Sequence, residues 1–124
     1  MGAQDNLAVA KEAQDAFGRG DFQRLDALTA DDVVWHEIGK DEPVRGKAAV
    51  RGETPSQAGY EVAIKVHDVL ASDDHAIALV EVTATRGGQT LNYRTAEIYH
   101  IRNGQIAERW AFSDDTDRIV RFFA

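Results

Sequence analysis

The sequence predicts an α+β fold in which helices pack on one face of a curved, mostly antiparallel sheet. The apolar residues of the N-terminal part have helical spacing, whereas the C-terminal half contains long β-branched segments. Consecutive strands are separated by Gly87-Gly88 and Asn103-Gly104, which indicate two-residue hairpins because both turn positions favour a positive φ. A sheet that curls over helices leaves a cavity between the two layers.

Helices are expected at both ends of the chain. Apolar residues recur every three or four positions over 6–17, which predicts an amphipathic helix with Asp5 as its N-cap. Helical spacing also predicts a short helix over 22–28 and a brief one over 47–51. Residues 114–123 are expected to form a short closing helix or a docked tail.

The first strand is predicted over 33–38, where the segment is β-branched and aromatic. Residues 39–46 contain Pro43 and several charges, and residues 54–59 contain Pro55, so both segments are expected to be loops. Four longer strands follow, at 61–70, 75–86, 89–102 and 105–113.

Length and charge limit the classes of protein to consider. The chain has 124 residues, which suits one domain spanning 1–124. A formal net charge of -7 argues against nucleic acid as a partner, because phosphate contacts depend on clustered Lys and Arg. The absence of cysteine excludes disulfides and thiolate metal sites. No stretch approaches the ~20 apolar residues of a membrane span, so a cytoplasmic protein without membrane contact is expected.

Motifs in both halves of the chain resemble one protein family. Residues 20–22, 28–36 and 46–50 resemble the opening half of SnoaL-like and ketosteroid-isomerase-like proteins, of the nuclear-transport-factor-2-like superfamily. Residues 99–110 resemble the strand pair of that family. The resemblance implies a cone-shaped α+β barrel that binds a small apolar ligand such as a polyketide, steroid or terpenoid. It also implies a homodimer and no cofactor.

The resemblance places two ionisable residues at catalytic positions. His36 stands where ketosteroid isomerases carry their general base, and a histidine can accept a proton near neutral pH. Glu97 stands where they carry an acid that stabilises an enolate oxygen and that apolar surroundings keep protonated. A histidine that only donates or accepts a hydrogen bond inside the cavity is the alternative for His36.

Glu81 is the third candidate catalytic residue, on the same strand face as Leu79. In limonene-epoxide-hydrolase-like relatives an acid at this position belongs to a carboxylate–Arg–carboxylate site. Leu79 stands where that site needs its Arg, however, and Ala111 where it needs its second Asp. Ala111 also replaces the acid of many polyketide cyclases, and Ala13 replaces the oxyanion Tyr of ketosteroid isomerases. This chain therefore lacks part of the catalytic set of each of these relatives.

Further residues are expected to contact a ligand or a second copy of the chain. Arg109 can pair with Glu81 or Glu97, and such an internal ion pair would oppose a protonated acid. Trp110 and Phe112 lie on the opposite strand face, where a dimer contact is expected. The predicted substrate-binding residues are Tyr93, Tyr99, Arg109, Val34, Ile38 and Leu79.

Two classes of function remain from the sequence. One is a cofactor-independent isomerase, cyclase or epoxide-opening enzyme that uses His36, Glu97 and Glu81 for proton transfer. The other is a non-catalytic binding protein with the same pocket; a partner-binding dimer with a residual cavity is a third reading. A metal site is not expected, because the four histidines lack paired ligand spacing. The catalytic hypothesis fails if His36, Glu81 and Glu97 lie far apart, or if they are engaged in an ion pair with Arg109.

Overall fold

The computed structural model describes residues 2–52 and 59–124 and confirms the α+β prediction. A curved, unclosed sheet has the strand order β2-β1-β6-β5-β4-β3. Neighbouring strands are antiparallel except β1 and β6, which run parallel. The helices are α1 (Ala3–Gly18), α2 (Phe22–Ala27), α3 (Lys47–Arg51) and α5 (Thr116–Phe123). The strands are β1 (Thr29–Trp35), β2 (Val44–Arg45), β3 (Glu61–Ala71), β4 (His75–Arg86), β5 (Gln89–Arg102) and β6 (Gln105–Ser113).

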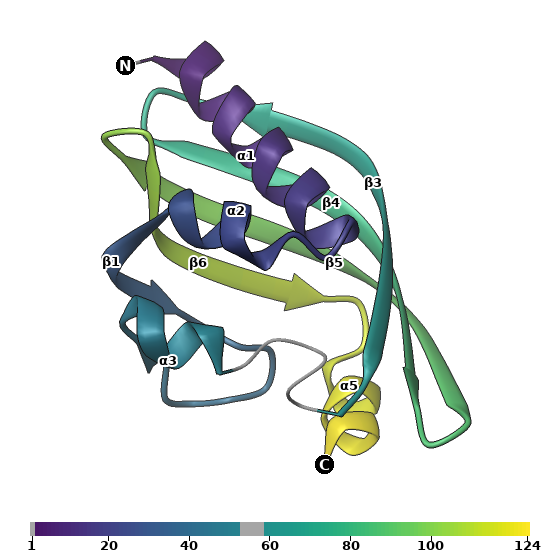
Figure 1. Cartoon of the computed structure of the whole chain (residues 1–124). Coiled ribbons are helices and arrows are strands. Elements are labelled where there is room, and N and C mark those ends of the chain that lie inside the picture. Colours follow the sequence, from purple (N-terminus) through teal and green to yellow (C-terminus); the bar gives the residue numbers. More distant parts are fainter. Residues whose placement is uncertain (1, 53–58) are drawn as a thin grey trace.

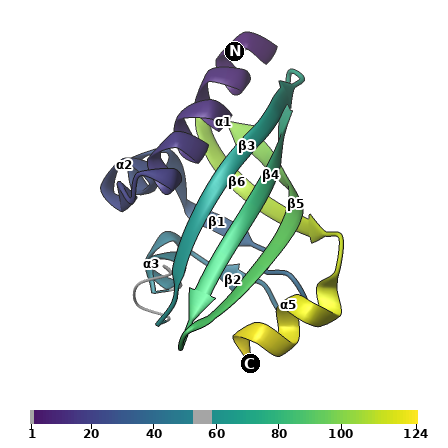
Figure 2. The same cartoon turned by 90° about the vertical axis from the view of Figure 1, so that its right-hand side faces the viewer.

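The long strands curve around the N-terminal helices. Figures 1 and 2 show α1 and α2 on the concave face of the sheet, with β3, β4 and β5 bending past them. Register shifts, which bend strands and increase their twist, occur in β3 between Val66 and Asp68 and in the β5–β6 pair between His100 and Ile101. The curvature creates the interior space in which the site lies.

Small side chains allow α1 to pack close to the sheet. Ala10, Ala13 and Ala16 are buried along one face of α1. The inner face of β4 is also built from small or medium apolar residues, from Ala76 through Val80 to Ala84. Close packing of this kind fixes the distance between the helix and the sheet, because a folded interior leaves few voids.

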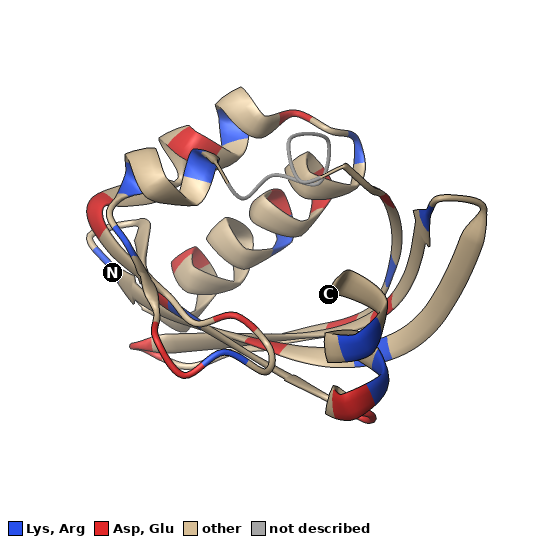
Figure 3. Ribbon diagram, turned by 90° about the horizontal axis from the view of Figure 1, so that it is seen from below, with Lys and Arg blue, Asp and Glu red and all other residues tan. Residues whose placement is uncertain are grey.

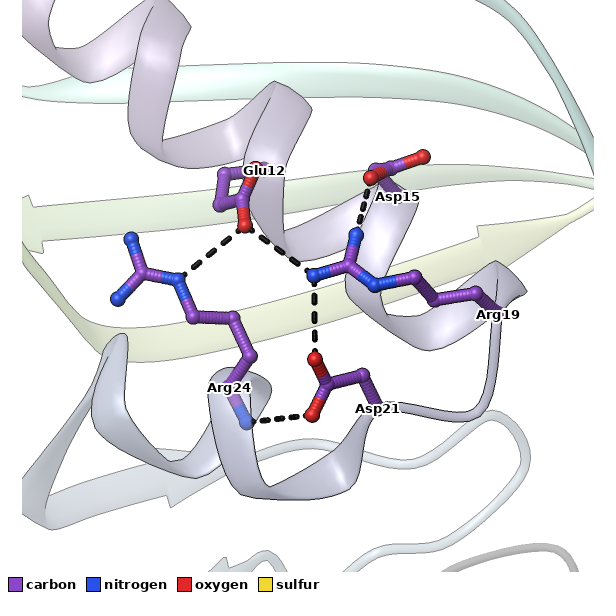
Figure 4. Close-up of polar contacts among 5 residues, drawn as sticks. All are labelled: Glu12, Asp15, Arg19, Asp21 and Arg24. Carbon is purple, nitrogen blue, oxygen red and sulfur yellow. Dashed lines mark hydrogen bonds and ion pairs between the residues drawn. The ribbon is translucent and has the colours of Figure 1, made fainter.

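An ion-pair network at the surface joins α1 to α2 (Figure 4). Arg19 contacts Glu12, Asp15 and Asp21, and Arg24 donates to Glu12 as well. Hydrogen bonds from Arg24 and Arg19 hold the pKa of Glu12 below its usual value. Asp21 is also the N-cap of α2, since it accepts a hydrogen bond from the Arg24 backbone at 3.1 Å. The network fixes the direction of α2, although exposed pairs add little stability individually.

Both predicted hairpin turns are confirmed. Gly87 and Gly88 have φ values of 57° and 79°, and Asn103 and Gly104 have values of 52° and 75°. A positive φ at both central positions matches the twist of the flanking strands. The two turns therefore fix the register of β4, β5 and β6.

The first strand differs from its predicted bounds. It begins at Thr29 and ends at Trp35, so His36 and Ile38 follow the strand rather than belong to it. The predicted loop over 39–46 contains the short strand β2, because Val44 and Arg45 pair with the end of β1. The predicted loop over 54–59 lies outside the described residues except at its last position. No helix of the described residues is long and apolar enough to cross a membrane.

Candidate functional site

A cavity of about 490 Å³ lies between the helices and the concave face of the sheet. Apolar side chains from α1, α2, β3, β4 and α5 form much of its wall. They include Phe17, Leu25, Val62, Ile64, Val80, Val82, Ile119, Val120 and Phe123. This volume is typical of a pocket for a small organic molecule. We call this cavity the interior pocket.

Helix α5 forms part of the pocket wall at the end of the sheet where β3 begins (Figures 1 and 3). Arg86, at the end of β4, donates hydrogen bonds to the carbonyl oxygens of Phe122 and Ala124, at 3.2 and 2.9 Å. Gly39 allows Val120 to approach closely, since a Cβ at Gly39 would lie 2.3 Å from the Val120 Cγ2. Because the φ of Gly39 is also +77°, glycine is the residue that fits there.

The polar groups of the pocket lie mainly along β5. Strand alternation predicts that Tyr93, Thr95, Glu97 and Tyr99 share a face, and all four line the pocket. Their partners on β4 are Val82, Val80, Ala78 and Ala76, so the polar row runs beside an apolar one. A ligand in the pocket would therefore meet a continuous row of hydrogen-bonding groups along β5.

An ion pair between Glu97 and Arg109 is the most strongly charged feature of the pocket. The Arg109 Nε and Nη2 atoms donate to Glu97 Oε1 at 3.0 and 2.6 Å, and each side chain is 13% exposed. Arg109 Nη1 also donates to the His36 carbonyl at 3.0 Å, and the guanidinium lies 4.6 Å from the Trp35 ring centroid. Burial lowers the pKa of Arg109, but the nearby Glu97, Tyr99 and Glu37 together raise it above its usual value. The guanidinium is therefore charged, fixed in place and committed to Glu97.

The Oε2 atom of Glu97 accepts no hydrogen bond from the described residues. Both hydrogen bonds from Arg109 end on Oε1, and within residues 2–52 and 59–124 no group donates to Oε2. Glu97 lines the pocket, so this second oxygen is an acceptor available to a ligand hydroxyl or to water.

Two neutral phenols flank the ion pair along β5. Gln14 Nε2 donates to the Tyr99 hydroxyl at 2.5 Å, and this hydrogen bond joins α1 to the sheet. Burial and the nearby Glu97 charge raise the pKa of Tyr99 well above its ordinary value. Burial likewise raises the pKa of Tyr93 to about 12. Both hydroxyls therefore keep their protons near neutral pH.

The structure places the His36 side chain against Glu108 and Trp110 and not among the residues that line the interior pocket. Its Nε2 atom lies 2.6 Å from Glu108 Oε2, and its ring stacks on Trp110 with 5.5 Å between centroids. Trp35 lines the pocket instead, because Trp35 and the buried Val33 face inward and their neighbours Val34 and His36 face outward. Val34 is therefore also absent from the pocket wall.

Glu81 and Leu79 lie outside the pocket as well, contrary to the expected orientation of their strand. Glu81 is exposed, whereas Val80 and Val82 on the opposite face of β4 line the pocket. Glu81 pairs in register with Arg94, which is exposed on the outer face of β5. The strand alternates as predicted, but the face with the smaller side chains is the inner one, because α1 packs against it.

The structure thus divides the predicted site residues into two groups. Glu97, Tyr93, Tyr99, Arg109 and Ile38 line the pocket. The other four, His36, Glu81, Val34 and Leu79, do not. The three groups of the catalytic hypothesis are not brought together, and the one that reaches the pocket is ion-paired.

Sequence reasoning missed three charged residues of the pocket wall: Glu37, Lys40 and Arg86. Glu37 and Lys40 follow β1, and Lys40 Nζ lies 3.7 Å from Glu37 Oε2. The charge of Glu37 also contributes to raising the pKa of Arg109. The inward parity of Val33 and Trp35 would have indicated Glu37, which is two residues further along the chain. Nothing in the local sequence indicates Arg86, whose position in the wall depends on the docking of α5.

Comparison with known proteins identifies the family. Residues 10–109 match the SnoaL-like domain. An uncharacterized protein of Mycobacterium tuberculosis is 28% identical over 126 residues, covering 96% of each chain. The solved structure of Bal32a, from a soil-derived mobile gene cassette, matches with a TM-score of 0.89 at 24% identity and covers 98% of each chain.

The fold is also similar to that of a solved structure whose name states an enzymatic activity. An LEH-like epoxide hydrolase of M. tuberculosis matches with a TM-score of 0.75 at 17% identity, over 90% of this chain and 84% of that one. At such identities the two structures show a shared fold alone. The sequence match extends from α1 to β6, and the chain belongs to the SnoaL-like domain family.

Proposed function

We propose that this protein binds a small, mostly apolar molecule with an oxygen-bearing polar edge in the interior pocket. The observation that carries the proposal is the pairing of a largely apolar cavity of about 490 Å³ with a row of polar side chains along β5. Pockets of this size with a few convergent polar groups are the usual sites for small organic ligands. Polyketide-, steroid- and terpenoid-like molecules fit this description.

The geometry favours binding over the three-residue catalytic scheme. His36 and Glu81 lie outside the pocket, and Glu97 accepts two hydrogen bonds from Arg109. Glu97 is thus positioned as an acceptor from Arg109 rather than as a donor to an enolate oxygen. In the binding function, Glu97 and the two tyrosines orient the ligand.

Proton transfer by Glu97 alone is the second candidate function, and the free Oε2 atom favours it. Arg109 holds the carboxylate in a fixed position, and a base needs its acceptor oxygen within hydrogen-bond reach of the proton that it removes. The likeness to an epoxide hydrolase adds epoxides to the carbonyl compounds as substrates to test. Glu97 would then activate water or remove a proton next to a carbonyl group.

A ligand screen with a matched pair of variants tests both candidates. Steroid, polyketide and terpenoid-epoxide mimics that bind in the pocket are expected to raise the Tm of the wild-type protein. Glu97→Gln, which keeps the shape of the side chain, is expected to weaken binding about tenfold, because a hydrogen bond to a charged group contributes about 1.5 kcal/mol. Glu81→Gln is the control and should leave the affinity unchanged, since Glu81 is outside the pocket.

Turnover of a hit separates the two functions. Product formation that Glu97→Gln abolishes and Glu81→Gln preserves supports proton transfer, whereas tight binding without product supports the binding protein. A hit whose affinity is unchanged in Glu97→Gln and in the pocket-filling variant Val82→Phe would place the ligand elsewhere and contradict the proposal.

We further propose that the chain forms a homodimer through the outer face of the sheet. Five apolar side chains adjoin on this face of β4, β5 and β6, and Phe112 is 59% exposed. The five are Ile77, Leu79, Ile98, Trp110 and Phe112. A contiguous apolar patch of this kind typically marks a protein contact, and a second copy presents the same patch to it.

Sedimentation measures this dimer directly. Phe112→Glu is expected to shift the chain from dimer to monomer, because it would place two charges in an apolar interface. Ala8→Glu is the control, at an exposed position of α1. A wild-type chain that sediments as a monomer at all accessible concentrations would contradict the proposal.

A further inference from the structure

We propose that the Thr95 hydroxyl binds a second polar group of the ligand and so selects molecules with two oxygen functions along one edge. The inference rests on the proposed binding function and names the class of ligand. One oxygen function would donate to Glu97 Oε2, and the other would pair with Thr95, two residues along the same strand.

Thr95 has an unsatisfied hydroxyl in the wall of the pocket. The residue lines the pocket, is 7% exposed, and its Oγ1 atom is buried. Within the part of the chain that the structure describes, it is the one buried side-chain N or O atom without a hydrogen-bond partner. Buried polar groups nearly always have a partner, so this exception needs a physical reason.

The neighbours of Thr95 explain why the protein supplies no partner. Its register partner on β4 is Val80, which has no polar side-chain atom. Its register partner on β6 is Ser113, whose hydroxyl lies 3.0 Å from the Thr116 hydroxyl at the start of α5. The space next to Thr95 that remains is the pocket itself.

Rotation about one bond makes the hydroxyl available to a ligand. The Thr side chain has three staggered rotamers, and a turn of about 120° about χ1 can bring the hydroxyl to the former position of the methyl group while the methyl group takes the position of the Cβ hydrogen. A ligand oxygen in the pocket would favour the rotamer that gives the hydroxyl a partner. The strand itself does not require the hydroxyl, since valine has the same shape and a similar preference for strands.

The position of Thr95 defines the ligand further. Thr95 and Glu97 point to the same side of β5, and positions two apart on a strand are separated by about 6.8 Å. Glu97 is ion-paired with Arg109, Lys40 lies next to Glu37, and Arg86 donates to backbone oxygens at the end of α5, so these charged side chains of the pocket wall already have partners. The geometry therefore fits an uncharged, mostly apolar molecule with a hydroxyl group and a second hydroxyl or carbonyl group on one edge.

Calorimetric titration with three bicyclic probes tests this inference. Naphthalene carries no oxygen, 2-naphthol carries one hydroxyl, and 2,7-dihydroxynaphthalene carries two hydroxyls on the same long edge. The wild-type protein is expected to prefer the two-oxygen probe over 2-naphthol by about tenfold, since one further hydrogen bond contributes about 1 kcal/mol or slightly more. Thr95→Val should lose that preference and bind 2-naphthol as the wild type does, and Thr95→Ser should keep the preference.

Thermal unfolding without ligand provides a second readout. Thr95→Val should leave the Tm unchanged or raise it, because it removes an unsatisfied buried hydroxyl without changing the side-chain shape. A Tm of Thr95→Val below that of Thr95→Ser would show that the hydroxyl has a partner in the free protein, and it would overturn the inference.

The experiment distinguishes failure of the proposed binding function from failure of the proposed role of Thr95. If the wild-type protein binds none of the three probes, the proposed binding function is contradicted, and the role of Thr95 with it. If the wild type binds them but Thr95→Val keeps the preference for two oxygens, only the role of Thr95 is overturned.

Discussion

Glu97→Leu is expected to lower the free energy of unfolding by about 3 kcal/mol, the effect of leaving one member of a buried ion pair without its partner. Arg109 would keep its charge, because a guanidinium group cannot lose its proton in a protein. Its side chain is only 13% exposed, so water cannot replace the two hydrogen bonds that Glu97 accepts. The opposite change, Arg109→Met, leaves the Glu97 carboxyl without the two hydrogen bonds that Arg109 donates and should also destabilise the protein.

The double variant separates loss of the ion pair from loss of packing. Glu97→Leu combined with Arg109→Met removes both charges, and an apolar replacement of a buried pair is often neutral or stabilising. The double variant should therefore be more stable than Glu97→Leu alone, with most of the lost free energy recovered. Urea unfolding at pH 7, followed by circular dichroism, measures all three variants.

Glu81→Leu is the matched control for this experiment. Glu81 lies on the adjacent strand but is exposed, and substitutions at such positions change the free energy of unfolding by about 0.5 kcal/mol or less. If Glu97→Leu is no more destabilising than Glu81→Leu, the Glu97–Arg109 pair is not the polar centre of the interior pocket.

The part of the site that lies on β5 could be predicted from the sequence, because hairpin turns fix the register of that strand. Asn103-Gly104 sets where β5 ends, and alternation then determines that Glu97 and Tyr99 share a face. For Arg109 the sequence leaves Glu81 and Glu97 open as partners, and the structure pairs it with Glu97. The local sequence was enough to predict which side chains of β5 share a face, because the strand is long and the turn that ends it is unambiguous.

The choice of inner face on β1 and β4 could not be made from alternation alone. On β4 one face carries Ile77 and Leu79 and the other carries alanines and valines, so both faces are apolar. The larger residues lie outside because α1 takes up the space next to the sheet. A shift of one residue in parity reverses every side chain, so the face that carries Glu81 is the outer one. The expectation for His36 rests on the family resemblance, which does not take the parity of β1 into account.

Other residues of the pocket depend on contacts between distant segments. Glu37 and Lys40 enter the wall through the segment after β1, and Ile119 and Phe123 enter it through α5. The periodicity of α5 predicts a helix with an apolar face, but it does not say which surface that face covers. Arg86, through its bonds to the end of α5, determines that surface.

Tyr99→Phe is expected to destabilise the protein by about 2 kcal/mol, because it removes the hydrogen-bond acceptor of a buried amide. Gln14 donates to the Tyr99 hydroxyl at 2.5 Å, and both residues are buried. Without the hydroxyl, the Gln14 amide would remain inside the protein without this partner. Gln14→Leu combined with Tyr99→Phe removes both polar groups and should recover most of the loss in urea unfolding at pH 8.

The pH dependence of the same variants tests whether the effect comes from the buried phenol. Because the folded-state pKa of Tyr99 lies above the unfolded value of about 10, the folded chain keeps a proton that the unfolded chain releases. The stability that this proton linkage provides is full below pH 10 and is lost as the pH rises above it. Tyr99→Phe lacks this linkage, so the difference in unfolding free energy between it and the wild type should shrink above pH 10.

Tyr93→Phe is the comparison for this titration, since the pKa of Tyr93 is also raised, to about 12, by burial. It should reduce the loss of stability above pH 10 as well, but it should not destabilise the protein at pH 8 as Tyr99→Phe does, because Gln14 keeps its partner. Equal destabilisation by the two variants at pH 8 would contradict a specific role for the Gln14–Tyr99 bond. The contact between α1 and the sheet would then depend on apolar packing and on the hydrogen bonds of Asn6 to the turn between β3 and β4.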